Sequence, residues 1–288
     1  CFAVVFGTRH TDATEHQDGL ILAIAMESVV KLVAFWTLGI YVVFFLFNGP
    51  ADLWQRATEN EAVMAALSHQ TPISRWLLLI ALSAFAIIML PRQFHVTVVE
   101  NRTNRELKLA GILMPLYLVA INVFVLPAAI GGIMTFENGG DADLYVLSLP
   151  LHGEMPIVSL ITFLGGFSAA TAMVIVASVA LAIMVSNDMV LPIFLRQKLL
   201  SRPSQRDDFA KTLLHIRRSA IFGVMLLGYV YYRSADNTTG LASIGLLAFA
   251  AIAQIAPALF GGLLWRRANA RGAIAGLSSG IFVWAYLL

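Results

Sequence analysis

Residues 155–187 are MPIVSLITFLGGFSAATAMVIVASVALAIMVSN, a run of 33 residues without Asp, Glu, Lys or Arg. A bilayer core of about 30 Å needs roughly 20 apolar residues in one helix. The stretch is therefore long enough to cross a membrane. A strand of a membrane β-barrel would have about 10 residues of alternating polarity. This segment is too long and too uniformly apolar for that, so it predicts an all-α transmembrane protein.

The composition of the whole chain supports the same fold class. It is 59% hydrophobic and 12% charged, against roughly 25% charged residues in soluble domains. The mean hydropathy of +0.79 excludes an ordinary soluble enzyme. The net charge of +2 does not indicate nucleic acid, and no nucleic-acid partner is expected. Cys1 is the only cysteine, which excludes an internal disulfide and a multi-cysteine metal site.

Six other stretches are also apolar enough to enter the bilayer, so we predict seven spans in one membrane domain, 1–288. Because the chain begins without Met and stops inside a hydrophobic run, we expect a fragment of a longer protein. The mixed apolar and polar 50–74 linker predicts a short interfacial helix on the outer surface. The predicted transmembrane helices are 19–47, 75–99, 109–136, 155–187, 212–232, 237–265 and 272–288, with a cytoplasmic loop at 188–211.

The charges of the linkers predict the topology. Basic linkers alternate with acidic or nearly neutral ones, and the basic set holds 15 Lys and Arg residues against 3 on the other side. The positive-inside rule places the basic set in the cytoplasm. Lys31 is the one basic residue within a span. The fifth span has few apolar residues, so we expect Arg217 and Arg218 at its cytoplasmic end to snorkel to the lipid headgroups.

The stretch Gly165 to Met173 (GGFSAATAM) contains the first candidate site. Ser168 and Thr171 are three residues apart and therefore share one helix face. Their hydroxyl oxygens suit a hard cation such as Na⁺, with backbone carbonyls completing the shell. Small and hydroxylated residues also serve helix packing in membranes. From spacing alone, packing is the favoured role.

The stretch Leu90 to His95 (LPRQFH) contains the second candidate site. Pro91 removes a helix hydrogen bond, and broken helices line the binding sites of many transporters. If the span continues to residue 99, then Arg92, Gln93 and His95 lie at membrane depth beside the break, as substrate-binding candidates. If the helix ends at Pro91, Arg92 is an ordinary cytoplasmic anchor. The residues leave both readings open.

Two further groups of polar residues are weaker candidates. Glu27 and Lys31 lie one helical turn apart within the first span, where a structural ion pair is favoured over a proton-linked or substrate-linked role. Residues 8–16 mix His and carboxylates without the spacing of a metal motif. No catalytic motif is found: there is no Walker A loop, Gly-x-Ser-x-Gly, His-Glu-x-x-His or Cys pair.

Together these stretches resemble the sodium:solute symporter family. The nearest resemblance is to the symporter-like membrane domain of bacterial sensor histidine kinases. The stretches that carry it are FGTRHTDATEH (6–16), LPRQFH (90–95), GGFSAATAM (165–173) and residues 257–280, with GGLLWRR at 261–267. The last pattern is typical of the whole family, whereas the first two are more particular to the kinase-linked branch. The similarity extends over nearly the whole chain.

The resemblance implies a LeuT-type bundle of two inverted five-helix repeats. The second to sixth spans would form the second repeat, and the first span would end the first repeat. Ser168 matches a sodium-coordinating hydroxyl of the family. The neighbouring position, a second hydroxyl in well-studied transporters, is Ala169 here, and Thr171 lies one turn away. Pro91 and Gln93 match a helix break beside the substrate site.

The resemblance further implies a multi-pass protein of the bacterial inner membrane that transports or senses a small solute, such as an amino acid or a carboxylate. Na⁺ would be the coupling ion, and a kinase domain would follow in the same chain. The alternatives are an ordinary sodium-coupled transporter without a signalling domain and a non-transporting membrane anchor. Whether the parent chain is an enzyme depends on that kinase domain. The isolated segment is not expected to transport.

Overall fold

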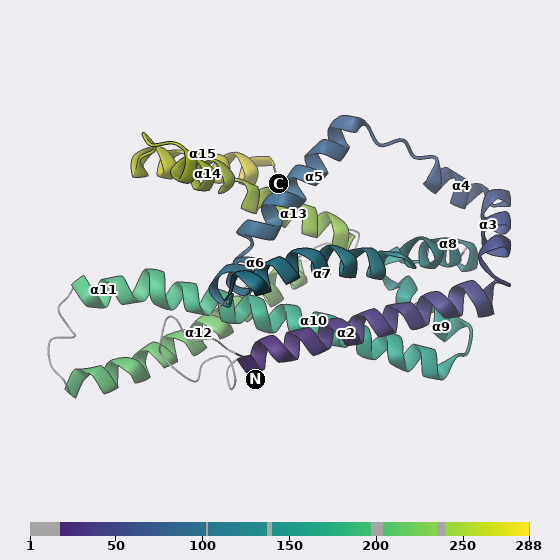
Figure 1. Ribbon diagram of the computed structural model, residues 1–288, viewed down its shortest axis with the longest axis horizontal. Coiled ribbons are helices and arrows are strands. Elements are labelled where there is room, and N and C mark those ends of the chain that lie inside the picture. Colours follow the sequence, from purple (N-terminus) through teal and green to yellow (C-terminus); the bar gives the residue numbers. More distant parts are fainter. Residues whose placement is uncertain (1–17, 102, 137–139, 197–203, 235–239, 288) are drawn as a thin grey trace. The chain divides into compact units, whose positions relative to one another are not determined.

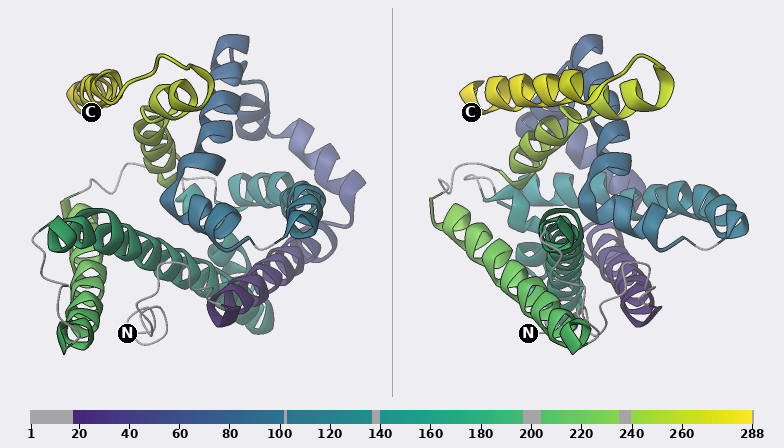
Figure 2. Two further views of the ribbon diagram at one scale, coloured as in Figure 1. Left: turned by 60° about the vertical axis from the view of Figure 1, so that its left-hand side comes forward. Right: turned by 90° about the vertical axis from the view of Figure 1, so that its left-hand side faces the viewer.

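The computed structural model describes residues 18–101, 103–136, 140–196, 204–234 and 240–287 (Figure 1). Within these ranges the chain forms helices and short connections and no strand, as Figure 2 shows from two further sides. The candidate motif at 6–16 lies outside them. The described residues belong to two compact units, the first containing 18–70 and 101–176 and the second 71–100 and 177–287.

Five described helices are long and apolar enough to cross a membrane, and a bent pair of helices would make a sixth span. The chain is therefore helical throughout its described part and has the character of a multi-pass membrane protein. The last predicted span, 272–288, coincides with the 18-residue helix α15 (Ala270–Leu287), which is not among the five. The five are Ile21–Leu46, Asn104–Thr135, Pro156–Ile193, Thr212–Ser234 and Leu241–Leu264, and the bent pair is Ile73–Met89 with Pro91–Val99.

The first unit is built around α2 and its neighbours. Leu38 and Val42 are fully buried in a core that also contains Leu149. The helices of this unit are α2 (Asp18–Tyr41), α3 (Pro50–Glu59), α4 (Glu61–Leu67), α7 (Asn104–Asn122), α8 (Val125–Thr135), α9 (Tyr145–His152) and most of α10 (Pro156–Met184), with a π-helical segment at Val42–Leu46 and a 3₁₀ turn at Ala142–Leu144.

Two aromatic side chains tie α7 to α2. The Tyr117 hydroxyl donates to the carbonyl oxygen of Ser28 at 3.1 Å, and the Trp36 indole N–H donates to that of Ala120 at 2.9 Å. Tyr and Trp in apolar surroundings need a partner for their polar atom. These bonds therefore fix α7 along the middle of α2.

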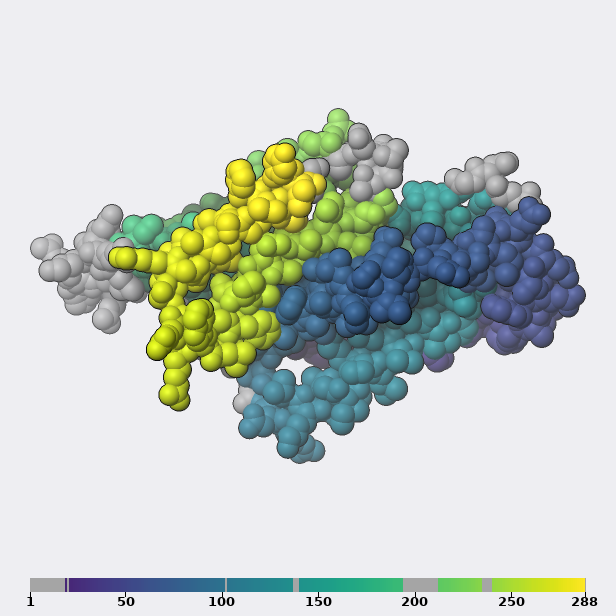
Figure 3. Space-filling model, turned by 90° about the horizontal axis from the view of Figure 1, so that it is seen from above, coloured from purple at the N-terminus to yellow at the C-terminus, as the bar shows by residue number. Residues whose placement is uncertain are grey.

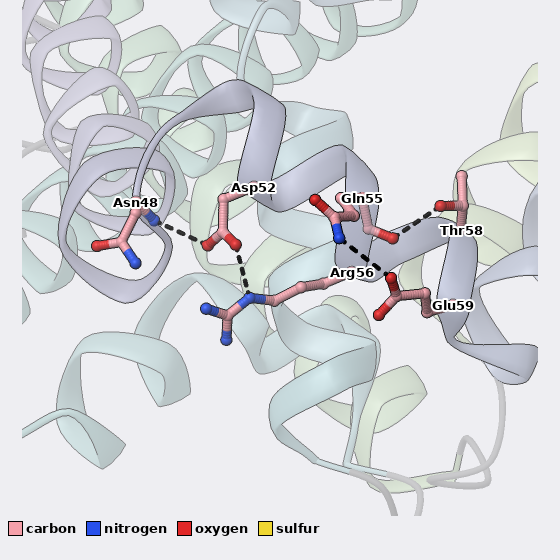
Figure 4. A network of polar contacts seen from close by, with 6 residues as sticks. All are labelled: Asn48, Asp52, Gln55, Arg56, Thr58 and Glu59. Carbon is pink, nitrogen blue, oxygen red and sulfur yellow. Dashed lines mark hydrogen bonds and ion pairs between the residues drawn. The ribbon is translucent and has the colours of Figure 1, made fainter.

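The expected interfacial helix is present as two short helices, α3 and α4, and its place on the outer surface remains a prediction. Asp52 accepts hydrogen bonds from the Asn48 backbone N–H and from Arg56 Nε, both at 3.0 Å (Figure 4). The hydrogen bond from the Asn48 N–H has the largest effect in holding the pKa of Asp52 below its usual value, and the hydrogen bond from Arg56 has the next largest. Leu53 and Ala57, one turn apart, are buried, and Gln55 is exposed on the opposite side, as expected of an amphipathic helix.

The second unit packs α5 against α13, and the ring of Phe85 on α5 lies at a centroid distance of 6.0 Å from that of Phe260 on α14. The prediction of a loop over 188–211 was wrong in secondary structure, because 191–196 and 204–211 are helical. The elements are α5 (Ile73–Met89), α6 (Pro91–Phe94), α11 (Leu191–Arg196), α12 (Ser204–Ser234), α13 (Leu241–Ala253), α14 (Ala256–Leu264), α15 and the end of α10, with π-helical segments at His95–Val99 and Val185–Val190.

Candidate functional site

In the first unit, α2 and α10 approach each other closely at one pair of small residues. Gly165 lies directly against Ala34, and a Cβ atom added to Gly165 would overlap the Ala34 side chain. Close approach of this kind is the usual role of glycine between membrane helices. Gly165 therefore has the packing role, and the neighbouring positions on α10 are brought close to α2.

Close to this contact, α2 and α10 enclose a cavity of about 270 Å³ that holds both a carboxylate and a hydroxyl. Glu27 of α2 and Thr171 of α10 are its polar lining residues. A carboxylate within a membrane-crossing helix is costly and marks a functional position by default. The apolar lining consists of Ala23, Ile24, Ala172, Ile175 and Val176.

The two predicted sodium ligands differ in their surroundings. Thr171 Oγ1 donates to the carbonyl oxygens of Phe167 and Ser168 at 2.9 and 3.0 Å, which uses its proton and leaves its lone pairs for a cation. The half-buried Ser168 hydroxyl forms no hydrogen bond with any described residue, and Ser168 is not part of the lining of the Glu27 cavity. Thr171, rather than Ser168, is thus the hydroxyl that lines the same cavity as the Glu27 carboxylate.

Lys31 lines a separate cavity of about 190 Å³ between the same helices. Thr162 and Ala169 of α10 are among its lining residues. No ion pair with a nitrogen–oxygen distance of 4.0 Å or less joins Glu27 to Lys31 in the described part of the chain. The expected ion pair between Glu27 and Lys31 is therefore not formed, and each of the two residues lines a different cavity.

The chemistry of the Glu27 cavity is that of a partial site for a hard cation. One carboxylate and one hydroxyl supply oxygen ligands, and backbone carbonyls or water would have to supply the rest. Among the described residues no three His, Cys, Asp or Glu side chains are grouped as a metal site. The cavity therefore suits Na⁺ or a proton better than a tightly held divalent or transition metal.

At the second candidate site α5 ends at Met89 and a second helical segment begins at Pro91. The chain bends by 53° between α5 and the helical segment 91–99. Leu90 is extended, with φ −61° and ψ 127°, and Pro91 is the first residue of the new helix, where its missing N–H costs nothing. Each alternative holds in part for the backbone, because α5 ends at Met89 and a bent helical segment then begins at Pro91. Arg92 and Gln93 are half-buried on the resumed segment.

His95 and Glu100 form a buried pair next to this break. His95 Nε2 lies 3.3 Å from Glu100 Oε1, and their side chains are 10% and 5% exposed. The contact lacks hydrogen-bond geometry at Nε2. His95 begins the π-helical segment His95–Val99, a kind of segment that often occurs at functional sites. The sequence indicated His95 but not its partner, because Glu100 lay in the predicted linker.

A buried cluster around Arg217 was missed. Arg217 of α12 is 3% exposed; its Nε donates to Ser186 Oγ at 3.2 Å and its Nη2 to Asn187 Oδ1 at 3.1 Å. The prediction that Arg217 snorkels to the headgroups was wrong, because its guanidinium is held by two polar side chains of the π-helical segment Val185–Val190. Arg218 is exposed, as expected. Adjacent polar residues at the end of the longest apolar run were the available signal.

The structure brings Thr171 together with Glu27 in the first unit, whereas Pro91, Arg92, Gln93 and His95 belong to the second. Comparison of the chain with protein-family models, with curated proteins and with solved structures finds no match. The functional assignment accordingly rests on the residues and their geometry.

Proposed function

We propose that the chain is part of a sodium:solute symporter-type membrane domain of a bacterial inner membrane, in which the cavity between α2 and α10 binds the coupling cation. The observation that carries the proposal is the shared lining of this cavity by Glu27 and Thr171. A half-buried carboxylate that shares a cavity lining with a hydroxyl supplies charge and oxygen ligands where water is scarce. The LeuT-type arrangement of two inverted repeats is part of the same proposal.

The broken helix at Pro91 supports the solute-binding half of the proposal. The 53° bend interrupts the helix at Leu90, and interrupted helices offer free backbone groups to a ligand. Arg92 and Gln93 supply a cation and an amide on the next turn. A small carboxylate or amino acid is the ligand class that this chemistry fits.

Na⁺ binding would favour one conformation of the bundle and thereby link the ion to the solute. In the sensor form of the proposal the same shift is passed to a kinase domain in the same chain. A histidine phosphoacceptor helix followed by an ATP-binding domain beyond Leu288 would support the sensor form, whereas one or two further helices and a stop would leave an ordinary transporter.

The cation site is tested by Na⁺ binding to the full-length protein in nanodiscs. We expect Glu27→Gln to abolish saturable binding, because it removes the negative charge from the cavity lining. Thr171→Val should weaken binding about tenfold or more, since a contact with a charged group is lost, and Thr171→Ser should retain it. Ser159→Ala is the matched control, because Ser159 is a buried α10 hydroxyl that donates to Met155.

Two outcomes would overturn the cation assignment. One is a protein whose binding and uptake show no dependence on Na⁺. The other is an equal loss in the Ser159→Ala control, which would mean that any change in α10 has the same effect. If Ser168→Ala alone removed binding, the ion would lie at Ser168 and not in the Glu27 cavity.

A further inference from the structure

A larger cavity, of about 380 Å³, lies in the second unit between α14 and α15. Its polar lining residues are Gln254, Arg267 and Asn269. The volume is within the range of about 300–1,000 Å³ that is typical of small-ligand sites. The rest of the lining consists mostly of small residues. These are Gly261, Gly262, Gly272, Ala273 and Gly276, beside Pro257, Ala258, Trp265, Ala268 and Leu277.

The glycines of this groove do not serve close helix packing. A Cβ atom added to Gly261, Gly262 or Gly276 would meet no atom within 4 Å. Glycine between membrane helices normally permits close contact of the two backbones. Here the small residues instead leave an open channel along the two helices.

The end of α15 that lies away from the α14–α15 turn is held against α13. Trp284 Nε1 donates to the carbonyl oxygen of Leu247 on α13 at 3.3 Å. A Cβ atom on Gly280 would lie 2.6 Å from Gln254 Oε1, so α15 approaches the end of α13 closely there. Towards the α14–α15 turn the two helices adjoin along the groove, as the yellow and yellow-green surfaces of Figure 3 indicate.

The charge of this region is entirely positive. Residues 237–288 contain Arg266, Arg267 and Arg271 and no Asp or Glu. Arg267 lines the groove and forms no hydrogen bond or ion pair with any described residue. A guanidinium presents its N–H groups in a fork that matches a phosphate. Trp265, also in the lining, is of the type that gathers at the headgroup level of a membrane.

We propose that the α14–α15 groove binds an anionic phospholipid, with the headgroup phosphate on Arg267 and an acyl chain along the glycine-lined channel. The α14–α15 turn belongs to the basic linkers, which the positive-inside rule places at the cytoplasmic face. Anionic lipids are concentrated in that leaflet. The site lies in the second unit and does not depend on the proposed cation site.

The headgroup contact is tested by lipid retention on the full-length protein in detergent, measured by native mass spectrometry with phosphatidylglycerol and phosphatidylcholine as probes. We expect phosphatidylglycerol to be retained preferentially. Arg267→Gln should weaken its retention about fivefold, the effect of one basic residue near an anionic surface. Arg266→Gln is the matched control: it removes the same charge one residue away, outside the lining.

The channel is tested by filling it. Gly276→Leu places a side chain in open space, so the fold should persist while lipid retention falls. Gly228→Leu, on α12 and equally open, should leave retention unchanged. Equal losses in the Arg266 and Arg267 variants would overturn the proposal in favour of general surface attraction. Inorganic phosphate that displaced the lipid, or raised the melting temperature as much as phosphatidylglycerol, would instead show a site for a soluble anion.

Discussion

A buried arginine that holds two helical segments together is the polar interaction that the structure adds at the scale of single residues. Arg217 donates to Ser186 and Asn187 from within α12. A charge at such a place is tolerated only when its donors are satisfied. The cluster therefore joins α12 to the π-helical end of α10, and its loss should be measurable as loss of stability.

We predict that Arg217→Ala lowers the free energy of unfolding by about 1–3 kcal/mol, because Ser186 and Asn187 lose their buried partner. Arg217→Lys should cost less, since it keeps the charge but not the planar fork. Thermal unfolding in detergent measures both. The exposed Arg218→Ala is the control and should stay within about 0.5 kcal/mol of the wild type. Equal effects at the two arginines would contradict the cluster.

At the scale of elements, the bend at Leu90 is the clearest departure from a straight membrane helix. Two helical segments meet there at 53°, and Pro91 is the first residue of the second. By contrast, Pro115 lies inside α7, which continues as a single helix. A proline alone therefore does not make a break. The extended conformation of Leu90 is what turns the chain.

We predict that Pro91→Ala lets the two segments align, because the N–H that completes the helix ladder is restored. Spin labels at the exposed residues Leu77 and Val98 report this. From the helix rise, straightening the 53° bend lengthens the label-to-label distance by about 3 Å. Pulsed electron–electron double resonance measures the distance between the two labels, and Pro115→Ala should leave that distance unchanged. A constant distance in Pro91→Ala would show that packing, not the proline, maintains the bend.

At the scale of the whole molecule, the distribution of charge predicts which ends of the helices share one side of the membrane. The basic linkers hold 15 Lys and Arg residues and the others 3. Because this bias sets orientation, the linker at 100–108 and the turn at 265–271 should both be cytoplasmic. The linker at 48–74 should face the outside.

The orientation is testable with single cysteines, introduced after Cys1 and every cysteine outside residues 1–288 have been replaced by Ser. In intact cells, a membrane-impermeant maleimide should label Glu59→Cys and should not label Arg105→Cys or Arg271→Cys. In inverted vesicles the pattern should reverse. If Arg105→Cys and Glu59→Cys were labelled from the same side, residues 59 and 105 would lie on one side of the membrane and the predicted topology would be wrong.

The sequence by itself determined that the protein is helical and apolar enough for several membrane crossings. Five of the seven predicted spans overlap described helices that are long and apolar enough to cross a membrane, and the span 75–99 overlaps the bent pair, because length, apolarity and internal hydrogen bonding are local properties. Pro91 marked a possible break, because proline lacks the N–H of a helix hydrogen bond, but Pro115 lies inside a continuous helix, so the residue type alone did not decide it.

Only the tertiary structure decided which side chains meet. Glu27 with Thr171, and Arg217 with Ser186 and Asn187, are pairs separated by many residues. Nothing in the local sequence sets the rotation of one helix against another. That rotation depends on where backbones approach, as at Gly165 against Ala34. The open α14–α15 groove also depends on how helices are placed: glycine permits a close contact at Gly165, whereas Gly261, Gly262 and Gly276 line open space.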